Sequence, residues 1–310
     1  MRVAIVGQQD FGKSVLEAFI ARGDEVAGVF CAPDREGAKA DPLKAAALER
    51  GLKVFQFASL RAKEAEEAMR ALGADIGIMA FVLQFAPQGF VNIPEHGTIQ
   101  FHPSLLPKYR GPSSINWPII RGDVKTGLSI FRPTDGLDEG PVILQKETPI
   151  GPDDTLGSIY FDRLFPMGVK AMLEAADLVM AGKNREADQD ETAASYEGWC
   201  RTAEARINWA NHVDFVFNLI RGCNPAPGAW TTLAGKRLQL FDCRKHLFRT
   251  FGAVKGKTGE VSGVTASGFF VTAQGGCIEV LKAKHEDGKK VSAGELVTAL
   301  GVVPGTCLGT

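Results

Sequence analysis

The sequence predicts an α/β fold in which a mostly parallel sheet is followed by a small, β-rich domain built as a barrel. Through the first half of the chain, short β-branched runs alternate with segments of helical pattern. Such alternation is typical of right-handed βαβ units, whose strands lie parallel. Beyond residue 206, short apolar runs are separated by glycine-bearing turns, which is typical of a small barrel. A chain of 310 residues can bury the cores of two domains.

The first domain is expected to begin with strands and helices in alternation. Strands are predicted at residues 2–6, 25–30, 53–57, 75–80 and 97–102, and helices at residues 11–22, 41–50 and 62–72. The runs 125–132 and 141–147 then predict a strand pair with no helix between them. Residues 155–181 predict a long helix that is apolar on one side and could pack across the sheet.

A change of composition near residue 185 predicts the domain boundary. Residues 184–192 are polar and charged, as in a linker or a surface crossing. We therefore expect a first domain over residues 1–185 and a second domain over residues 206–310. Strands of the second domain are predicted at residues 236–241, 259–264, 268–273 and 277–283.

Composition and charge argue against several classes of protein. The 35 Lys and Arg residues balance 36 Asp and Glu residues, so the chain has no overall attraction to nucleic acid or an anionic membrane. The first apolar run is too short for a signal peptide, and no run is long enough to span a membrane. The six cysteines show no CxxC or Cys/His ligand spacing, so we expect free thiols in a reducing cytoplasm and no metal site.

His102 and Asp138 are the candidate catalytic residues. His102 ends an apolar strand and is followed by a Pro103-Ser104 turn, and Asp138 lies in a glycine-bracketed loop between two further strands. An imidazole and a carboxylate at the carboxyl end of a parallel sheet suit acid–base chemistry on a small ligand. Asp135, which precedes a glycine, is expected to serve only the turn.

The segment after the first strand offers an alternative class of function. Residues 7–14 read Gly-Gln-Gln-Asp-Phe-Gly-Lys-Ser and match the phosphate-loop pattern, in which the lysine reaches the terminal phosphates and the serine holds magnesium. No acidic strand end for that magnesium is evident downstream, but phosphate-loop nucleotide binding stays open as the alternative. The dinucleotide fingerprint GxGxxG fails, because Gln9 stands where its middle glycine is needed.

The segments around both candidate catalytic residues resemble a known family. The run His102-Pro-Ser-Leu-Leu-Pro107 with Arg110-Gly111, followed by Asp135-Gly-Leu-Asp138-Glu-Gly140, is similar to the signature of the folate-dependent formyltransferases. The resemblance covers essentially the whole chain and looks like the hydrolase-domain branch of 10-formyltetrahydrofolate dehydrogenase. It is carried by residues 1–30, 81–87, 115–123, 144–147, 196–197, 206–209 and 227–230. The chain is also similar to methionyl-tRNA formyltransferase.

The resemblance implies a Rossmann-like formyltransferase domain followed by a small OB-like barrel, with 10-formyltetrahydrofolate as the formyl donor and no metal. His102 would hydrogen-bond or protonate the formyl oxygen, and Asp138 would orient and deprotonate the nucleophile. The stretch Gln84-Phe85-Ala86 would line the folate site. Two residues before the histidine, the ribonucleotide and tRNA enzymes have asparagine, whereas this chain has Gln100. The hydrolase-type domain also lacks that asparagine, and Gln100 could donate its amide to the oxyanion.

Three kinds of formyl acceptor remain open. The hydrolase-type branch favours water or a small molecule, and related domains formylate amino-sugar nucleotides. The tRNA enzymes have a longer, basic loop after the second strand, whereas residues 31–44 hold three acids and three bases, so tRNA is disfavoured. A basic face on the second domain could still bind it, through Lys236, Arg237, Arg244, Lys245, Arg249, Lys255 and Lys257. The sequence predicts no oligomeric state.

Overall fold

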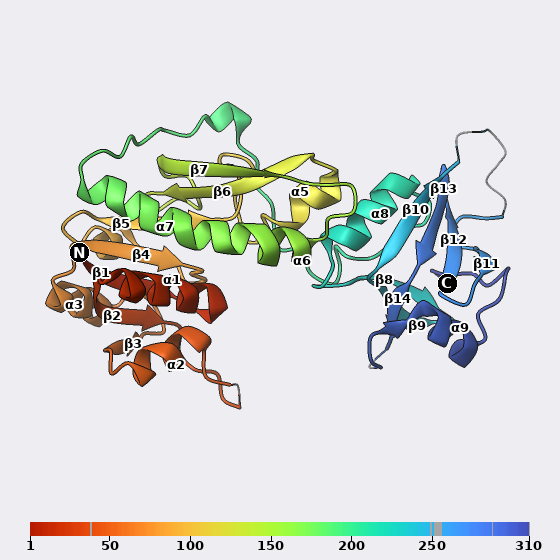
Figure 1. The fold of residues 1–310 in the computed structure, drawn as a ribbon, viewed down its shortest axis with the longest axis horizontal. Helices are drawn as coiled ribbons and strands as arrows, with labels where there is room; N and C mark the ends of the chain where they lie inside the picture. The colour runs from red at the N-terminus through yellow and green to blue at the C-terminus, as the bar shows by residue number, and fades with distance from the viewer. Residues whose placement is uncertain (38, 249, 251–255, 287, 310) are drawn as a thin grey trace. The chain divides into compact units, whose positions relative to one another are not determined.

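A computed structural model describes residues 1–37, 39–248, 250, 256–286 and 288–309 of the chain, which fold into two compact units (Figure 1). The first unit consists of Met1–Gly111, Gly127–Thr148 and Arg163–Tyr196, and the second consists of Pro112–Thr126, Pro149–Asp162 and Glu197–Thr310. The last passage between the units, after Tyr196, falls inside the predicted boundary region. Residues 112–126 and 149–162 belong to the second unit, although they lie inside the predicted first domain.

A seven-stranded sheet has the strand order β3-β2-β1-β4-β5-β6-β7. Its strands are β1 (Arg2–Gly7), β2 (Glu25–Cys31), β3 (Val54–Gln56), β4 (Ile76–Ala80), β5 (Thr98–His102), β6 (Lys125–Phe131) and β7 (Val142–Pro149). The first five strands are parallel to their neighbours, and β6 runs antiparallel to β5. The α/β class with a mostly parallel sheet is thereby confirmed.

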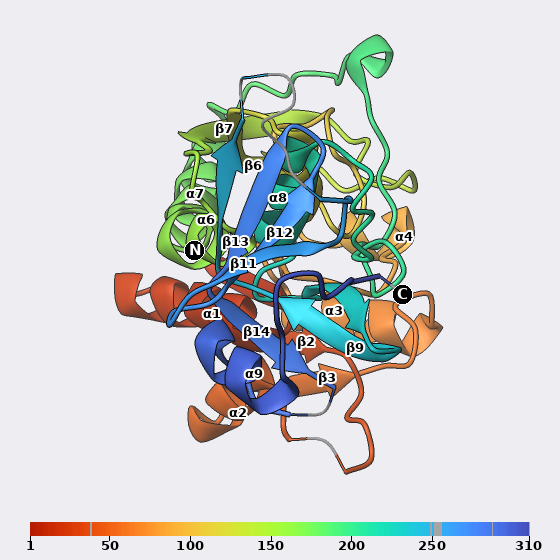
Figure 2. The same ribbon diagram turned by 90° about the vertical axis from the view of Figure 1, so that its right-hand side faces the viewer.

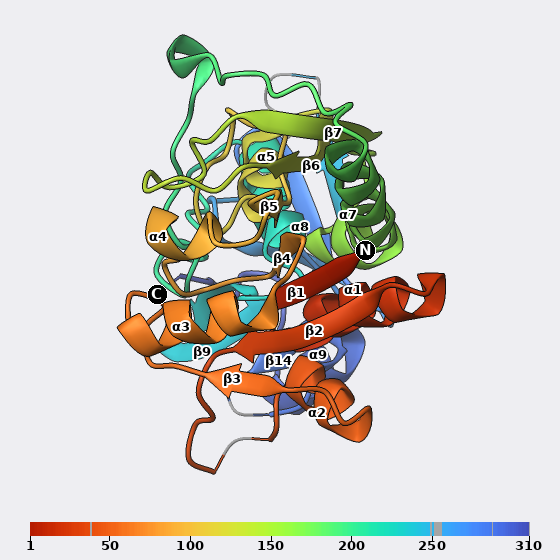
Figure 3. The same ribbon diagram turned by 90° about the vertical axis from the view of Figure 1, so that its left-hand side faces the viewer.

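Helices cover both faces of this sheet, because its strands are apolar on both sides. On one face, α1 (Gln9–Arg22), α2 (Pro42–Glu49) and α7 (Phe165–Met180) pack around Val3 and Ile5 of β1. On the other face, α3 (Lys63–Leu72) and α4 (Gln88–Val91) pack around the alternate β1 residues. Figure 3 shows the two helical layers on either side of the strands. The long predicted helix is confirmed in three consecutive pieces, since α6 (Leu156–Ile159) and a π-helical turn (Tyr160–Leu164) precede α7.

The parallel strands β1, β4 and β5 are neighbours, so their carboxyl ends lie side by side at one edge of the sheet. Ligands of open α/β sheets bind at this edge, in the crevices between the loops that follow the strands. His102 is the last residue of β5. The fold therefore places the candidate histidine where a small ligand would be bound.

The second unit contains two four-stranded sheets, in the orders β10-β13-β12-β11 and β15-β14-β9-β8. Figure 2 labels β11, β12 and β13 of the first sheet and β9 and β14 of the second. The strands are β8 (Ala229–Leu233), β9 (Lys236–Leu240), β10 (Cys243–Leu247), β11 (Val261–Val264), β12 (Phe269–Ala273), β13 (Gly276–Val280), β14 (Lys282–His285) and β15 (Val291–Ser292). Neighbouring strands pair antiparallel, which confirms the β-rich second part. An OB-like barrel stays a prediction.

Among the described residues, four α-helices also belong to the second unit: α5 (Asn116–Arg121), α6, α8 (Val213–Gly222) and α9 (Ala293–Leu300). α8 lies in a stretch where the sequence pattern suggested strands, and its buried side chains join one core cluster with both sheets. None of the helices formed by the described residues has the length and apolar character needed to cross a membrane.

Candidate functional site

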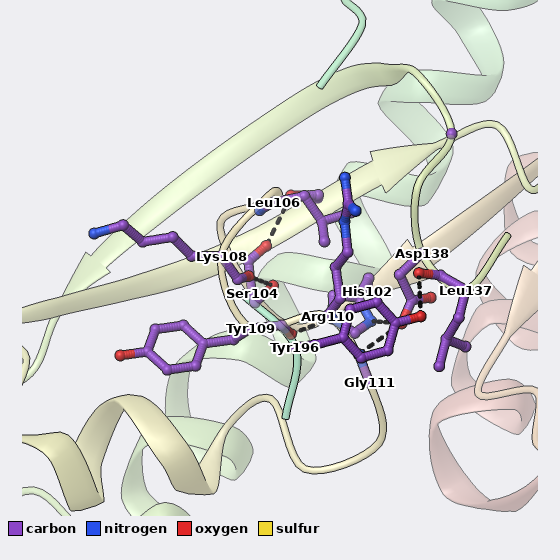
Figure 4. Close-up of polar contacts among 12 residues, drawn as sticks. His102, Ser104, Leu106, Lys108, Tyr109, Arg110, Gly111, Leu137, Asp138 and Tyr196 are labelled. Carbon is purple, nitrogen blue, oxygen red and sulfur yellow. Dashed lines mark hydrogen bonds and ion pairs between the residues drawn. The ribbon is translucent and has the colours of Figure 1, made fainter. Parts of the chain in front are cut away.

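The side chain of His102 is buried at the carboxyl end of β5 (Figure 4). Its Nε2 atom is 2.9 Å from the main-chain oxygen of Tyr109. A carbonyl oxygen can only accept a hydrogen bond, so Nε2 carries a proton and donates it. The other ring nitrogen, Nδ1, is therefore the atom at which His102 gains or loses a proton.

Asp138 faces that nitrogen from the loop between β6 and β7. Its Oδ2 atom is 3.6 Å from Nδ1 of His102, and each of the two side chains is 7% exposed. The same oxygen accepts the main-chain N–H of Gly111 at 2.9 Å. The backbone of Asp138 has a φ of 57°, in the left-handed region that Asp visits more readily than most residues. The structure thus brings the predicted pair together, while its catalytic role stays a prediction.

The His102 ring and the Asp138 carboxylate face each other without a direct hydrogen bond. When Nδ1 is unprotonated, two electron-rich atoms face each other, and when it is protonated, an imidazolium faces a carboxylate. A separation of 3.6 Å exceeds an ordinary hydrogen-bond length. The pair can therefore direct the Nδ1 proton toward a ligand oxygen that develops negative charge.

The turn after His102 is fixed by hydrogen bonds to its own backbone. Ser104 Oγ donates to the main-chain oxygen of Lys108 at 2.7 Å. Ser129 Oγ, from β6, donates to the main-chain oxygen of Ser104 at 2.7 Å. Tyr109 has a φ of 58°, which turns the chain so that its carbonyl meets the imidazole. The orientation of the histidine is therefore built into the turn.

The three residues expected to line the folate site follow β4 and present different groups. Gln84 Nε2 donates to the main-chain oxygen of Phe57 at 2.9 Å, and Ala86 is buried in the core. Phe85 is 43% exposed, with the Arg61 guanidinium 4.4 Å from its ring centroid. Of the three, Phe85 thus offers apolar surface to a ligand, whereas Gln84 holds the loop in place.

Asp135 makes a structural contact beyond its own turn, in addition to the turn role expected from the sequence. Its Oδ1 atom accepts the main-chain N–H of Gln88 at 3.1 Å. The contact joins the loop that carries Asp138 to the start of α4, directly after the Gln84-Phe85-Ala86 stretch.

Gln100 precedes His102 by two residues on β5, so the two side chains project from the same face of the sheet. Its neighbours on the adjacent strands are Met79 of β4 and Phe131 of β6. The position suits an amide that points to the same ligand as the histidine, and the role of donor to an oxyanion stays a prediction.

The structure contradicts the phosphate-loop alternative. α1 begins at Gln9, so only Gln8 separates it from β1, and the second half of the octapeptide is helical. The N–H of Gln9 donates to Oδ2 of Asp41 at 2.9 Å, where a phosphate oxygen would have to bind. Gly7 is explained by packing, because a Cβ atom there would lie 2.0 Å from the main-chain oxygen of Ala80.

Residues 184–192 were expected to form a linker or a surface crossing, and Gln189 of this segment and Tyr196 after it contact the loop of Asp138. Gln189 Nε2 donates to the main-chain oxygen of Asp138 at 2.8 Å. The Tyr196 hydroxyl donates to the main-chain oxygen of Leu137 at 3.0 Å. In the sequence, the only signal for this contact was the place of Tyr196 among the segments that resemble the formyltransferases.

Cysteines and acidic residues do not combine into a metal site in the described part of the chain. All six cysteines are free thiols. No group of three His, Cys, Asp or Glu side chains among the described residues could hold a metal ion.

Comparison with known families matches both parts of the chain. Residues 1–176 match the profile described as Formyl transferase, and residues 200–300 match the profile described as Formyl transferase, C-terminal domain. The chain belongs to the formyl transferase family. The site of His102 and Asp138 lies within the first of the two matched regions.

Two curated relatives are similar over nearly the whole chain. Mitochondrial 10-formyltetrahydrofolate dehydrogenase of Mus musculus is 37% identical over 311 residues, which cover 96% of this chain and 33% of that protein. The chain thus spans about a third of the length of that relative. Methionyl-tRNA formyltransferase of Geotalea uraniireducens (strain Rf4) is 32% identical over 314 residues, which cover 100% of this chain and 98% of that protein.

Among solved structures, the chain is similar to HypX from Aquifex aeolicus in complex with tetrahydrofolic acid. The TM-score is 0.65 at 18% identity, over 96% of this chain and 47% of that one. At 18% identity this likeness supports the fold of the chain, and it says nothing of the chain's substrate or activity.

Proposed function

We propose that this formyl transferase family member takes the formyl group from 10-formyltetrahydrofolate and passes it to water or a small acceptor, releasing tetrahydrofolate. The observation that carries the proposal is the opposition of His102 Nδ1 and Asp138 Oδ2 across 3.6 Å in a buried site. The carboxyl edge of the sheet is where such a ligand would bind. The choice of donor is supported by the likeness to relatives that are named for it.

The reaction needs a proton donor at the formyl oxygen and a proton acceptor at the nucleophile. Attack of a water oxygen on the formyl carbon converts its carbonyl into a tetrahedral oxyanion, which the Nδ1–H of a protonated His102 stabilises. Asp138 takes a proton from the attacking water. Its Oδ1 atom is the better placed oxygen, because Oδ2 already accepts the N–H of Gly111.

Collapse of the tetrahedral intermediate completes the reaction. The bond between the formyl carbon and N10 breaks, N10 takes up a proton, and tetrahydrofolate leaves. With water as nucleophile the other product is formate, and with an amine it is the formamide. Gln100, on the same face of β5 as His102, would add a neutral donor to the oxyanion. Phe85 would cover an apolar part of the donor.

The loop after β2 favours a small acceptor over tRNA. Asp34 of this loop forms an ion pair with Lys44, in the first turn of α2, so that lysine adds little positive potential here. Affinity for a phosphate backbone comes from cations that neutralise phosphates. A loop whose charges cancel would contribute little of it.

The second unit favours the same choice. Lys245 Nζ is 2.5 Å from Oδ1 of Asp214, and Lys236 Nζ is 3.3 Å from Oε2 of Glu286. These cations of the predicted basic face are thus paired with acids. Two other members of that set, at positions 249 and 255, lie outside the described residues.

The test is donor turnover by the purified chain, followed by the appearance of tetrahydrofolate and of formylated product. Separate arms contain water alone, a small thiol, a small amine, a nucleotide-linked amino sugar and charged initiator tRNA. We expect turnover with water or a small acceptor, and we expect His102→Ala to abolish it. The control is His96→Ala, which changes a histidine just before the start of β5 and should keep the turnover. Rapid formylation of the tRNA or the sugar nucleotide would overturn the acceptor class. Absence of tetrahydrofolate in every arm would overturn the donor.

A further inference from the structure

The carboxamide of Gln189 lies between a buried arginine and the Asp138 loop (residues 132–141). Its Nε2 atom donates to the main-chain oxygens of Asp138 and Gly140, at 2.8 and 2.7 Å. Its Oε1 atom accepts from Nε and Nη2 of Arg110, at 3.1 and 2.9 Å. Both amide hydrogens and the amide oxygen are engaged within the chain, so the group has a single orientation.

Arg110 is itself fixed from the far side. Its side chain is 2% exposed, and Nη1 and Nη2 donate to the two carboxylate oxygens of Glu191 at 2.9 and 2.6 Å. These hydrogen bonds raise the pKa of Arg110 above its ordinary value, against the opposing effect of burial. A guanidinium fork bound by a carboxylate is rigid. Gln189 therefore accepts its hydrogen bonds from a guanidinium group that is itself held in place by Glu191.

Two more contacts hold the same loop at its sides. The main chain of Ala187 pairs with Val142, with N···O distances of 2.9 and 2.8 Å. The Tyr196 hydroxyl donates to the main-chain oxygen of Leu137 at 3.0 Å, as Figure 4 shows. A tyrosine hydroxyl has an ordinary pKa of about 10, so it is a donor at neutral pH. Gln189 thus acts at the middle of a loop whose two sides are tied separately.

Asp138 needs such a restraint at its backbone. Its φ of 57° is unfavourable for a residue with a Cβ atom unless the surroundings enforce it. If the backbone relaxed, the carboxylate would leave both the Gly111 N–H and the His102 ring. We propose that Gln189, braced by Arg110, is a positioning residue that holds Asp138 in this conformation and so keeps its carboxylate on Nδ1 of His102. The consequence for turnover rests on the proposed function, whereas the consequence for the loop does not.

The test compares Gln189→Glu with a matched control. The variant keeps an oxygen for Arg110 but loses both N–H donors and directs a carboxylate at two carbonyl oxygens. Gln239→Glu is the control, because Gln239 is also half-buried and also donates from Nε2 to a main-chain oxygen, that of Pro227, at 3.1 Å. Gln189→Met removes the donors without adding charge and serves if the first variant fails to fold.

Three quantities are measured: kcat and KM in steady-state turnover of 10-formyltetrahydrofolate, and hydrogen exchange of the Gly111 amide, which reports whether the Asp138 carboxylate is in place. For the Gln189 variants we expect a fall in kcat of about thirty-fold from the two lost hydrogen bonds. The KM for the donor should change by less than about twofold. Exchange of the Gly111 amide should become at least tenfold faster, and the control should match the parent in all three.

The outcomes separate the two proposals. Unchanged Gly111 exchange in both Gln189 variants would overturn the positioning role, whatever the activity. An equal loss in kcat in Gln239→Glu would also overturn it, since the effect would then be general destabilisation. If the parent chain turns over no donor but Gly111 exchange accelerates in the Gln189 variants, the positioning role stands and the proposed function falls.

Discussion

Asp135 joins two loops of the site, because its Oδ1 atom accepts the main-chain N–H of Gln88 at 3.1 Å. Gln88 is the first residue of α4, and the N-cap residue of that helix, Pro87, provides no side-chain hydrogen bond. Asp135 thus supplies, from another loop, the acceptor that a helix start lacks. The link ties the loop of Asp138 to the stretch proposed to line the folate site.

Replacing Asp135 by alanine should weaken binding of the donor more than it slows the chemistry. Loss of a helix cap costs about 1 kcal/mol, so we expect the KM for 10-formyltetrahydrofolate to rise about fivefold, with kcat within about twofold. Initial rates over a range of donor concentrations measure both. Asp162→Ala, at an exposed position of the π-helical turn, is the control. An unchanged KM in Asp135→Ala would show that the link has no part in binding.

Asp138→Asn should abolish most turnover while keeping the loop intact. The asparagine oxygen can keep the Gly111 N–H, and the same oxygen then faces Nδ1 of His102 without the negative charge that stabilises an imidazolium. The site then has neither a base for the nucleophile nor an imidazolium for the oxyanion. We expect kcat to fall about 100- to 1000-fold.

The thermal midpoint of Asp138→Asn should stay within a few degrees of the parent, because the hydrogen bond to Gly111 survives. A second measurement separates this variant from a simple unfolding effect: binding of tetrahydrofolate by titration calorimetry should persist. Turnover within tenfold of the parent would remove Asp138 from the catalytic role.

Much of the fold followed from the sequence because its signals are local. β-branched runs and helical spacing marked the strands of the first unit and the helices α1, α2 and α3 to within a few residues, whereas no helix was predicted at α4. α8 was missed among strand-like patterns, although Val213, Val216, Phe217 and Ile220 recur at helical spacing and are buried. In that region glycine-bearing turns were the stronger signal, so no helix was predicted there.

The site was predictable only where one motif carried it. His102 and Asp138 stood out because a strand end and a glycine-bracketed loop are readable in sequence. Gln189 did not, because a polar segment that donates to main-chain oxygens has the composition of a linker. Asp135 was taken as turn chemistry, since the partner of its carboxylate is 47 residues away. A contact between a side chain and a main-chain atom far along the chain produces no periodic pattern in the sequence.

Gly7→Ala should destabilise the protein strongly. Gly7 pairs with Ala80 in the sheet, and a Cβ atom there would lie 2.0 Å from the Ala80 oxygen. Removing this overlap requires β1 to move away from β4, which should lower the free energy of unfolding by about 3 kcal/mol or more. Urea unfolding measures the change. Gly198→Ala is the control, because no atom lies within 4 Å of a Cβ there. Equal midpoints for the two variants would contradict the close approach of the strands.

Cys31 should react slowly with alkylating reagents in the folded protein. Burial, and then the Asp41 carboxylate, raise the pKa of its thiol from 9.0 to about 11. At pH 8 its thiolate fraction is then about a hundredfold below that of an ordinary thiol. The raised pKa also means that its contribution to stability is complete below about pH 9 and declines as the pH rises toward 11. Mass spectrometry of iodoacetamide-treated protein measures the rate, with urea-unfolded protein as the control. Equal rates in both states would contradict the raised pKa.

Gln100→Leu tests whether the glutamine serves the oxyanion. Leucine has nearly the same volume but no amide, so a donor used only in the transition state would be lost without loss of binding. We expect kcat to fall about tenfold, with the KM for the donor within about twofold. Thr98→Val, on the same face of β5 but nearer its start, should leave kcat unchanged. Gln100→Asn keeps the amide on a side chain one methylene shorter, and asparagine is the residue that the resemblance assigns to this position in the ribonucleotide and tRNA enzymes. If Gln100 sets the acceptor, this variant raises the rate with a small amine relative to the rate with water by several-fold, and an unchanged ratio would place acceptor choice elsewhere in the site.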